Sequence, residues 1–77
     1  MHYRAKLLVG QIEVTADGKT EQEAIDVALK DSVSVRTAAS KNPSDVALVM
    51  FHVHPGQRQP QHVSYATTLG KHNLATS

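Results

Sequence analysis

The stretch HYRAKLLVGQIEVTADG, residues 2–18, alternates apolar and polar side chains on both sides of a glycine. A period of two residues is typical of β-strands that bury one face. Because glycine accepts a positive φ, Gly10 and Gln11 are expected to close a tight turn between two antiparallel strands. This hairpin is favoured over a single strand bent at Gly10, because one register sets all its apolar side chains on one face. The apolar pairs in that register are Val9 with Ile12, Leu7 with Val14 and Ala5 with Ala16.

A helix is expected directly after the hairpin, in TEQEAIDVALKD, residues 20–31. Thr20 and Glu23 have the spacing of a capping box, in which both side chains accept hydrogen bonds from free amides at the helix start. The apolar residues that recur at helical spacing and should face the core are Ala24, Ile25, Ala28 and Leu29.

The next segment, SVSVRTAASKN, residues 32–42, allows two interpretations. It continues the helix to about residue 40, with Asn42-Pro43 as the stop. Alternatively it is a strand, because Val33 and Val35 alternate with serines and the segment has poor helix propensity. One long helix is the favoured interpretation.

The most apolar run is VALVMFHVH, residues 46–54, whose length and β-branched content predict a strand. A helix capped by Asn42 is the alternative there. Residues 55–61 are expected to be a loop, and residues 62–68 a returning strand.

The predicted fold is therefore α+β, in the order β-β-α-β-β. A small antiparallel sheet of three to four strands carries one helix packed on one face. Residues 1–69 are expected to form this single domain, and residues 70–77 a flexible C-terminal tail.

The run TADGKTEQEAIDVALKDS, residues 15–32, is similar to the strand, turn and capped helix of HicB-type antitoxins. It is also similar to the end of double-stranded-RNA-binding domains. The acidic-proline loop of the former and the basic helix start of the latter are absent from this chain. Neither resemblance therefore implies a function here.

Composition narrows the ways in which this chain can gain stability. It has 77 residues, enough for one domain at most, and no cysteine. A core of this size buries a modest share of the chain, so small domains often depend on disulfides, a metal or a partner subunit. Without cysteine, disulfides and thiolate zinc sites are excluded. A second subunit or a histidine-bound metal is left as the expected support.

The face of the sheet opposite the helix is the main candidate site, because one helix covers only one face. Its apolar centre is expected to be Leu8, Val46, Leu48 and Met50. The charged residues expected around that centre are Arg4, Lys6 and Glu13. Exposed apolar patches with polar rims mark interaction sites, so a dimer or partner interface is predicted. The alternative is that the C-terminal tail or the last strand covers this face.

The function expected from this surface is that of a small, non-enzymatic protein-interaction module. It would be a homodimeric regulator or inhibitor that occludes a protein partner. The sequence contains no phosphate-binding glycine loop and no nucleophile elbow, so no catalytic residue and no cofactor are assigned. No stretch has the length of a membrane span or of a signal peptide, so a cytoplasmic location is expected.

Two other functions remain open. Arg4, Lys6 and Arg58 are the candidate phosphate contacts of a nucleic-acid-binding regulator, although a net charge of +1 is low for that role. The aromatic residues Tyr3 and Phe51 are expected in the core rather than on a nucleic-acid surface.

The remaining alternative is a metal site formed by His52, His54 and His62. Three histidines and a water are the ligand set of a catalytic zinc. The first two histidines alternate along the predicted strand, so they are expected to share its open face. A pH-responsive contact, or simply the polar end of a strand, is the other interpretation of these histidines.

Overall fold

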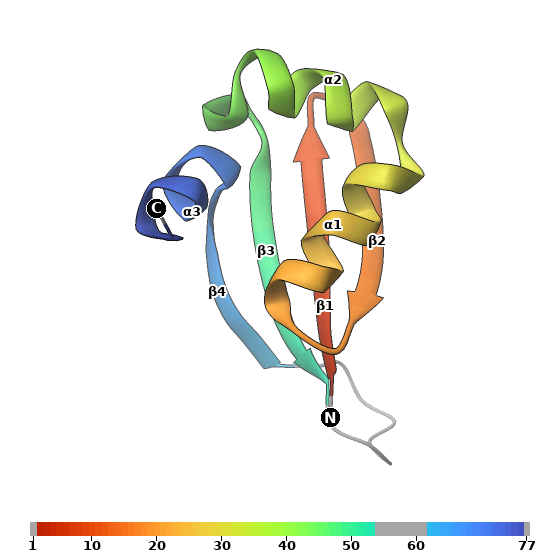
Figure 1. Ribbon diagram of the computed structural model, residues 1–77, viewed down its shortest axis with the longest axis vertical. Helices are drawn as coiled ribbons and strands as arrows, with labels where there is room; N and C mark the ends of the chain where they lie inside the picture. Colours follow the sequence, from red (N-terminus) through yellow and green to blue (C-terminus); the bar gives the residue numbers. More distant parts are fainter. Residues whose placement is uncertain (1, 54–61, 77) are drawn as a thin grey trace.

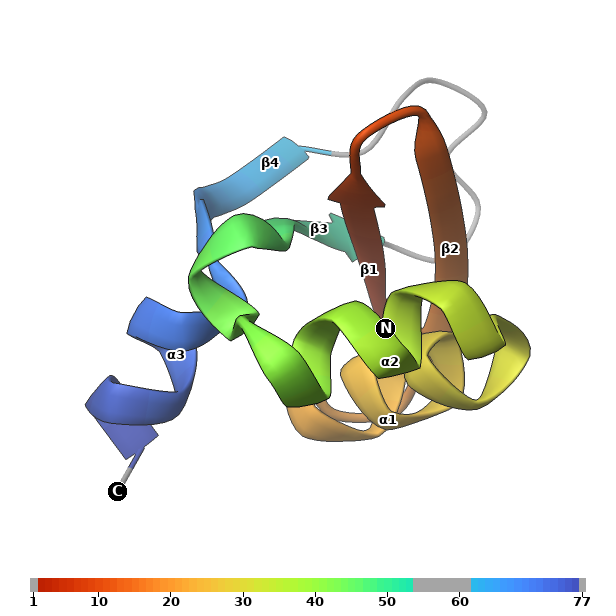
Figure 2. The ribbon, with the colours of Figure 1, turned by 90° about the horizontal axis from the view of Figure 1, so that it is seen from above.

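The computed structural model of the protein describes residues 2–53 and 62–76. These residues form one four-stranded antiparallel sheet in the order β2-β1-β3-β4, with α1 and α2 on one of its faces (Figures 1 and 2). The elements in chain order are β1 (His2–Val9), β2 (Ile12–Gly18), α1 (Glu21–Asp31), α2 (Val33–Lys41), the 3₁₀ turn η1 (Pro43–Asp45), β3 (Ala47–Val53), β4 (His62–Thr68) and α3 (Leu69–Thr76). The α+β class and the antiparallel sheet are as predicted, but the described helices number three rather than one.

The first hairpin has the register that its alternation predicts. Val9 lies opposite Ile12, Leu7 opposite Val14 and Ala5 opposite Ala16. Gly10 has a φ of 59°, and no other described residue has a positive φ. A positive φ at the first central position alone is the pattern of a type II′ turn, whose twist matches that of the flanking strands.

The predicted long helix is divided in two at Ser32. This residue has φ −136° and ψ 114°, so the chain is extended between α1 and α2. The Ser32 hydroxyl accepts a hydrogen bond from the Val35 amide at 3.2 Å, which caps the start of α2. Serine side chains offer the backbone this alternative to helical hydrogen bonding. The break turns α2 across the end of the sheet (Figure 1), where Val35 is fully buried.

The start of α1 is capped by Thr20, as the sequence predicts. Its hydroxyl accepts from the Glu23 amide at 3.0 Å. The Glu23 carboxylate accepts from the Lys19 amide at 3.3 Å, one residue before the amide that a regular capping box uses. Ala24, Ile25 and Ala28 of α1 are buried.

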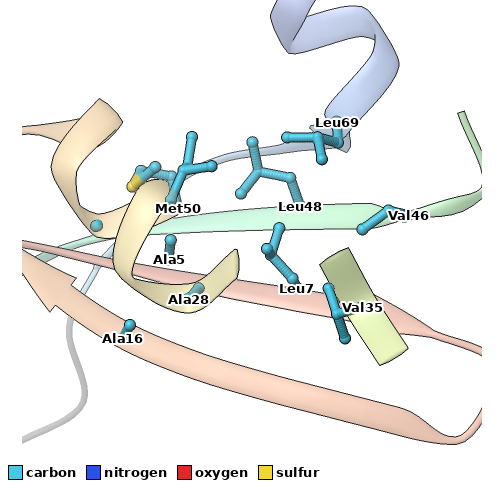
Figure 3. Close-up of a cluster of buried hydrophobic side chains, with 11 residues drawn as sticks. Ala5, Leu7, Ala16, Ala28, Val35, Val46, Leu48, Met50 and Leu69 are labelled. Carbon is cyan, nitrogen blue, oxygen red and sulfur yellow. The ribbon is translucent and has the colours of Figure 1, made fainter. Parts of the chain in front are cut away.

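The core lies between the sheet and α1, α2 and the start of α3. Figure 3 shows side chains of β1 and β3 meeting those of the helices. Its buried residues are Ala5, Leu7, Ala16, Ala24, Ile25, Ala28, Val35, Val46, Leu48, Met50 and Leu69.

The prediction of which side chains of β3 face the helices was wrong. Val46, Leu48 and Met50 were expected on the open face, but each is 0% exposed. The reason is the pairing with β1, which sets Leu48 opposite Leu7 and Met50 opposite Ala5. Residues opposite each other in neighbouring strands share a face, so both join the core.

The last segment is helical, where a tail was expected. Helix α3 follows β4 without a loop, and Leu69 at its start is 3% exposed. The Leu69 amide donates to the Val46 carbonyl oxygen at 2.8 Å, which ties α3 to the start of β3. Among the described residues, no helix combines the length and the apolar character needed to cross a membrane.

Candidate functional site: the open face of the sheet

The open face is the face of the sheet that lies away from α1 and α2. Its members alternate with the buried residues along each strand and follow from the pairing of the strands. They are His2, Arg4, Lys6 and Leu8 of β1, Glu13, Thr15 and Asp17 of β2, Ala47, Val49, Phe51 and Val53 of β3, and Val63, Ala66 and Thr68 of β4. No helix of the described part lies over this face (Figure 2).

The half of the open face formed by β1 and β2 is charged but internally neutralised. Arg4 donates from Nε to Asp17 Oδ1 at 2.7 Å and from a terminal nitrogen to Asp17 Oδ2 at 3.1 Å. His2 Nε2 lies 3.1 Å from the same carboxylate. Lys6 Nζ lies 3.2 Å from Glu13 Oε1. Each cation of β1 therefore has an acidic partner on β2.

The interaction between Arg4 and Asp17 also shifts the pKa values of both side chains. The hydrogen bond from Arg4 lowers the pKa of Asp17 below its usual value, and the same bond raises the pKa of Arg4. Both side chains stay partly in contact with solvent, so the pair is a surface ion pair whose contribution to stability is modest.

The half formed by β3 and β4 is apolar. Val63 is 56% exposed, while Val49, Phe51 and Val53 are half-buried by their neighbours in the sheet. Within the sheet, Phe51 lies opposite Val63, and Val49 lies opposite Ala66. The larger side chains are therefore on β3 and the smaller ones on β4. These five residues, Val49, Phe51, Val53, Val63 and Ala66, are called the apolar strip below.

The open face was predicted from the sequence, but only part of its membership was. Leu8, Arg4, Lys6 and Glu13 lie on the open face, whereas Val46, Leu48 and Met50 lie in the core. The apolar strip was missed, and Phe51 was wrongly expected in the core. β3 is apolar on both faces, so alternation along this strand holds no signal that distinguishes them.

The histidines proposed as metal ligands do not share the open face. His52 lies on the helix-covered face and stacks on the Tyr3 ring, with ring centroids 4.9 Å apart and planes at 14°. In the strand pairing, position 52 lies opposite position 62. His54 and the side chain of His62 are outside the described part. Within that part, no group of three or more histidine, cysteine or acidic residues is arranged to hold a metal ion.

The structure describes two of the three proposed nucleic-acid contacts. Arg4 and Lys6 are neighbours on the open face, and each has an acidic partner. Arg58 lies outside the described residues. The structure adds Phe51, which was expected in the core, because it lies directly opposite Arg4 on β3.

On the other face, a polar contact ties β4 to α1. The Tyr65 hydroxyl donates to Glu21 Oε2 at 2.8 Å. Burial, followed by this hydrogen bond, raises the pKa of Tyr65 to about 12. The contact anchors the edge strand that carries Val63 and Ala66, so it helps to position the apolar strip.

The chain was compared with models of protein families, with curated proteins and with solved structures, and no match was found in any of the three.

Proposed function

We propose that this protein is a small, non-enzymatic module that binds a protein partner through the open face of its sheet. It acts in the cytoplasm as a regulator or inhibitor, by occluding the surface that it binds. The observation that carries the proposal is the apolar strip, which has Val63 56% exposed and no described helix over it.

The energetics of the strip support a binding role. Burying a valine or phenylalanine side chain fully is worth about 1.5–3 kcal/mol relative to leaving it exposed. Val49, Phe51 and Val53 already have part of this gain, and Val63 has less of it. An apolar partner surface would complete the burial of all four side chains.

The charges beside the strip favour a protein over a charged polymer. Arg4 and Lys6 are matched by Asp17 and Glu13, so these four side chains contribute no net charge. A partner therefore needs an apolar patch with a polar rim rather than a run of phosphates. This is the anatomy of a protein–protein interface.

The proposal is tested by photo-crosslinking in the cells that produce the chain. A photoreactive amino acid is placed at position 63, in the apolar strip, and in a matched control at position 15, in the charged half. The expected result is a covalent adduct with a protein at position 63 and much less adduct at position 15. Absence of any protein adduct at position 63 would contradict the proposal.

A second candidate function is binding of single-stranded nucleic acid, and the observation that favours it is the position of Phe51 opposite Arg4. An aromatic ring beside a cation is the stacking unit of single-strand-binding surfaces, and Phe51 is half-buried on the open face. The neutralising acids Asp17 and Glu13 weigh against it, because unpaired cations are what displace the counterions condensed on the phosphates of a nucleic acid. The salt dependence of binding separates the two candidates. Phosphate contacts would give a log–log slope of about −0.7 per contact on a single strand, and an apolar protein interface would give little slope.

A further inference from the structure

We infer that the occupant of the open face is a second copy of this chain, held with β3 of one subunit over β4 of the other. The inference rests on the proposed function, since it requires the open face to bind protein. It adds that a second copy of the chain covers this face until another protein displaces it, and it adds the arrangement of the two sheets.

The apolar strip is self-complementary about a two-fold axis parallel to the strands and placed between β3 and β4. Such an axis lays β3 of each subunit over β4 of its partner and leaves the rows of the sheet aligned. Phe51 then faces Val63 of the partner subunit, and Val49 faces Ala66 of the partner subunit. Larger side chains thus meet smaller ones, as interdigitating layers of two packed sheets require.

Two other two-fold arrangements of this face oppose unfavourable groups. An axis perpendicular to the strands lays β1 on β1 and β2 on β2, so at the level of Ala5 it sets Arg4 against Lys6 of the partner subunit. Glu13 then faces Asp17 of the partner subunit. An axis between β1 and β3 lays the cations of β1 on the apolar side chains of β3, which removes charges from water without a new partner.

An axis between β1 and β2 would instead lay the cations of each subunit over the acids of the other. Those charges already form ion pairs within the subunit, at 2.7 Å for Arg4–Asp17 and 3.2 Å for Lys6–Glu13. Exchanging one exposed pair for another contributes little free energy. Of these four arrangements, only the one with β3 over β4 buries the apolar strip and leaves the ion pairs in solvent.

The size of this contact sets the expected strength of the dimer. Two of the four strands overlap, so the buried area falls below the ~800 Å² per partner of a standard interface. We expect a reversible dimer with a Kd of about micromolar. A heterologous contact is not needed, because the same strip provides both sides of an isologous interface.

Sedimentation of the purified chain over a wide range of concentrations tests the inference. The wild type is expected to shift from monomer to dimer as the concentration rises. Val63→Glu should remain monomeric throughout that range with an unchanged circular dichroism spectrum, because it sets a charge against Phe51 of the partner subunit. Thr15→Glu, in the charged half of the same face, is the control and should dimerise as the wild type does.

A second measurement needs no substitution. In a mixture of isotopically labelled and unlabelled wild-type chains, isotope-filtered NMR is expected to detect contacts between the Phe51 ring and Val63 methyl groups of different subunits. A wild type that stays monomeric, a dimer that persists in Val63→Glu, or a dimer without these contacts would each overturn the inference. If the purified chain is monomeric while position 63 crosslinks to a different protein, the inference fails and the proposed function stands. If position 63 forms no protein adduct, the proposed function itself fails.

Discussion

Leu7 of β1 and Leu48 of β3 lie directly opposite each other, and both side chains are 0% exposed. This pair decides which face of β3 is buried, because Val49, the next residue along the chain, then points to the open face. The pairing of β1 with β3 therefore decides both which side chains of β3 enter the core and which form the apolar strip.

Alanine substitutions at the two adjacent positions test that pairing. Leu48→Ala is expected to lower the free energy of unfolding by about 2–5 kcal/mol, because it leaves a cavity in the core. Val49→Ala is expected to cost less than about 1 kcal/mol in the monomer, since its side chain is only half-buried. Urea denaturation at low protein concentration measures both. Equal costs, or a larger cost at position 49, would mean that β3 is turned the other way.

No side chain is expected to fit at position 18, because the start of α1 packs against Gly18. A Cβ at this position would lie 2.4 Å from the Ala24 backbone nitrogen and 2.8 Å from the Glu23 carbonyl carbon. Gly18→Ala should therefore displace α1 and cost about 1–3 kcal/mol, the usual range for overpacking.

Gly10 is the matched control for that variant, because its requirement is conformational and not steric. Its φ is 59° and a Cβ there would meet nothing within 4 Å. Gly10→Ala should cost about 1 kcal/mol, and Gly10→Asn should recover part of it, since asparagine is among the residues that accept the positive φ of such hairpin turns. At position 18 asparagine should be no better tolerated than alanine. Recovery by asparagine at position 18 would contradict the close packing against α1.

Thr20→Ala is expected to cost about 1 kcal/mol of stability through loss of the helix cap. The hydroxyl that it removes accepts from the Glu23 amide at 3.0 Å. Thr20→Ser keeps the hydroxyl and should remain close to the wild type. Thermal unfolding followed by circular dichroism measures both variants, and an unchanged Thr20→Ala would show that α1 does not depend on this cap.

The burial of Tyr65, together with its hydrogen bond to Glu21, predicts a loss of stability in alkaline solution. The pKa of Tyr65 is raised to about 12 in the folded chain, against about 10 in an unfolded one. The stabilising contribution is therefore fully present below about pH 10 and is lost as the pH rises through about 12. Tyr65→Phe lacks the ionisable group, so its stability should fall less steeply over this window. The difference in unfolding free energy between the wild type and Tyr65→Phe, measured against pH, should become smaller as the pH rises through this window. A constant difference would contradict the prediction.

The break at Ser32 and helix α3 are two features that sequence patterns did not predict. Val35 has the helical spacing of the α1 stripe and is buried. It reaches the core only because the chain turns at Ser32, so that α2 crosses the end of the sheet (Figure 1). Helix α3 has a weak amphipathic pattern of its own, and the burial of Leu69 beside Val46 is what joins it to the domain.

The sequence by itself determined the hairpin register and the start of α1. Both depend on groups that are close along the chain: alternation around Gly10 in one case, and the Thr20 hydroxyl three residues from the Glu23 amide in the other. Only the tertiary structure decided which side of β3 faces the helices. That strand is apolar on both sides, and a shift of one residue in its pairing with β1 would exchange its two faces. The candidate interaction surface follows from this long-range pairing, which is why its position could be predicted from the sequence while Phe51 and Val63 could not.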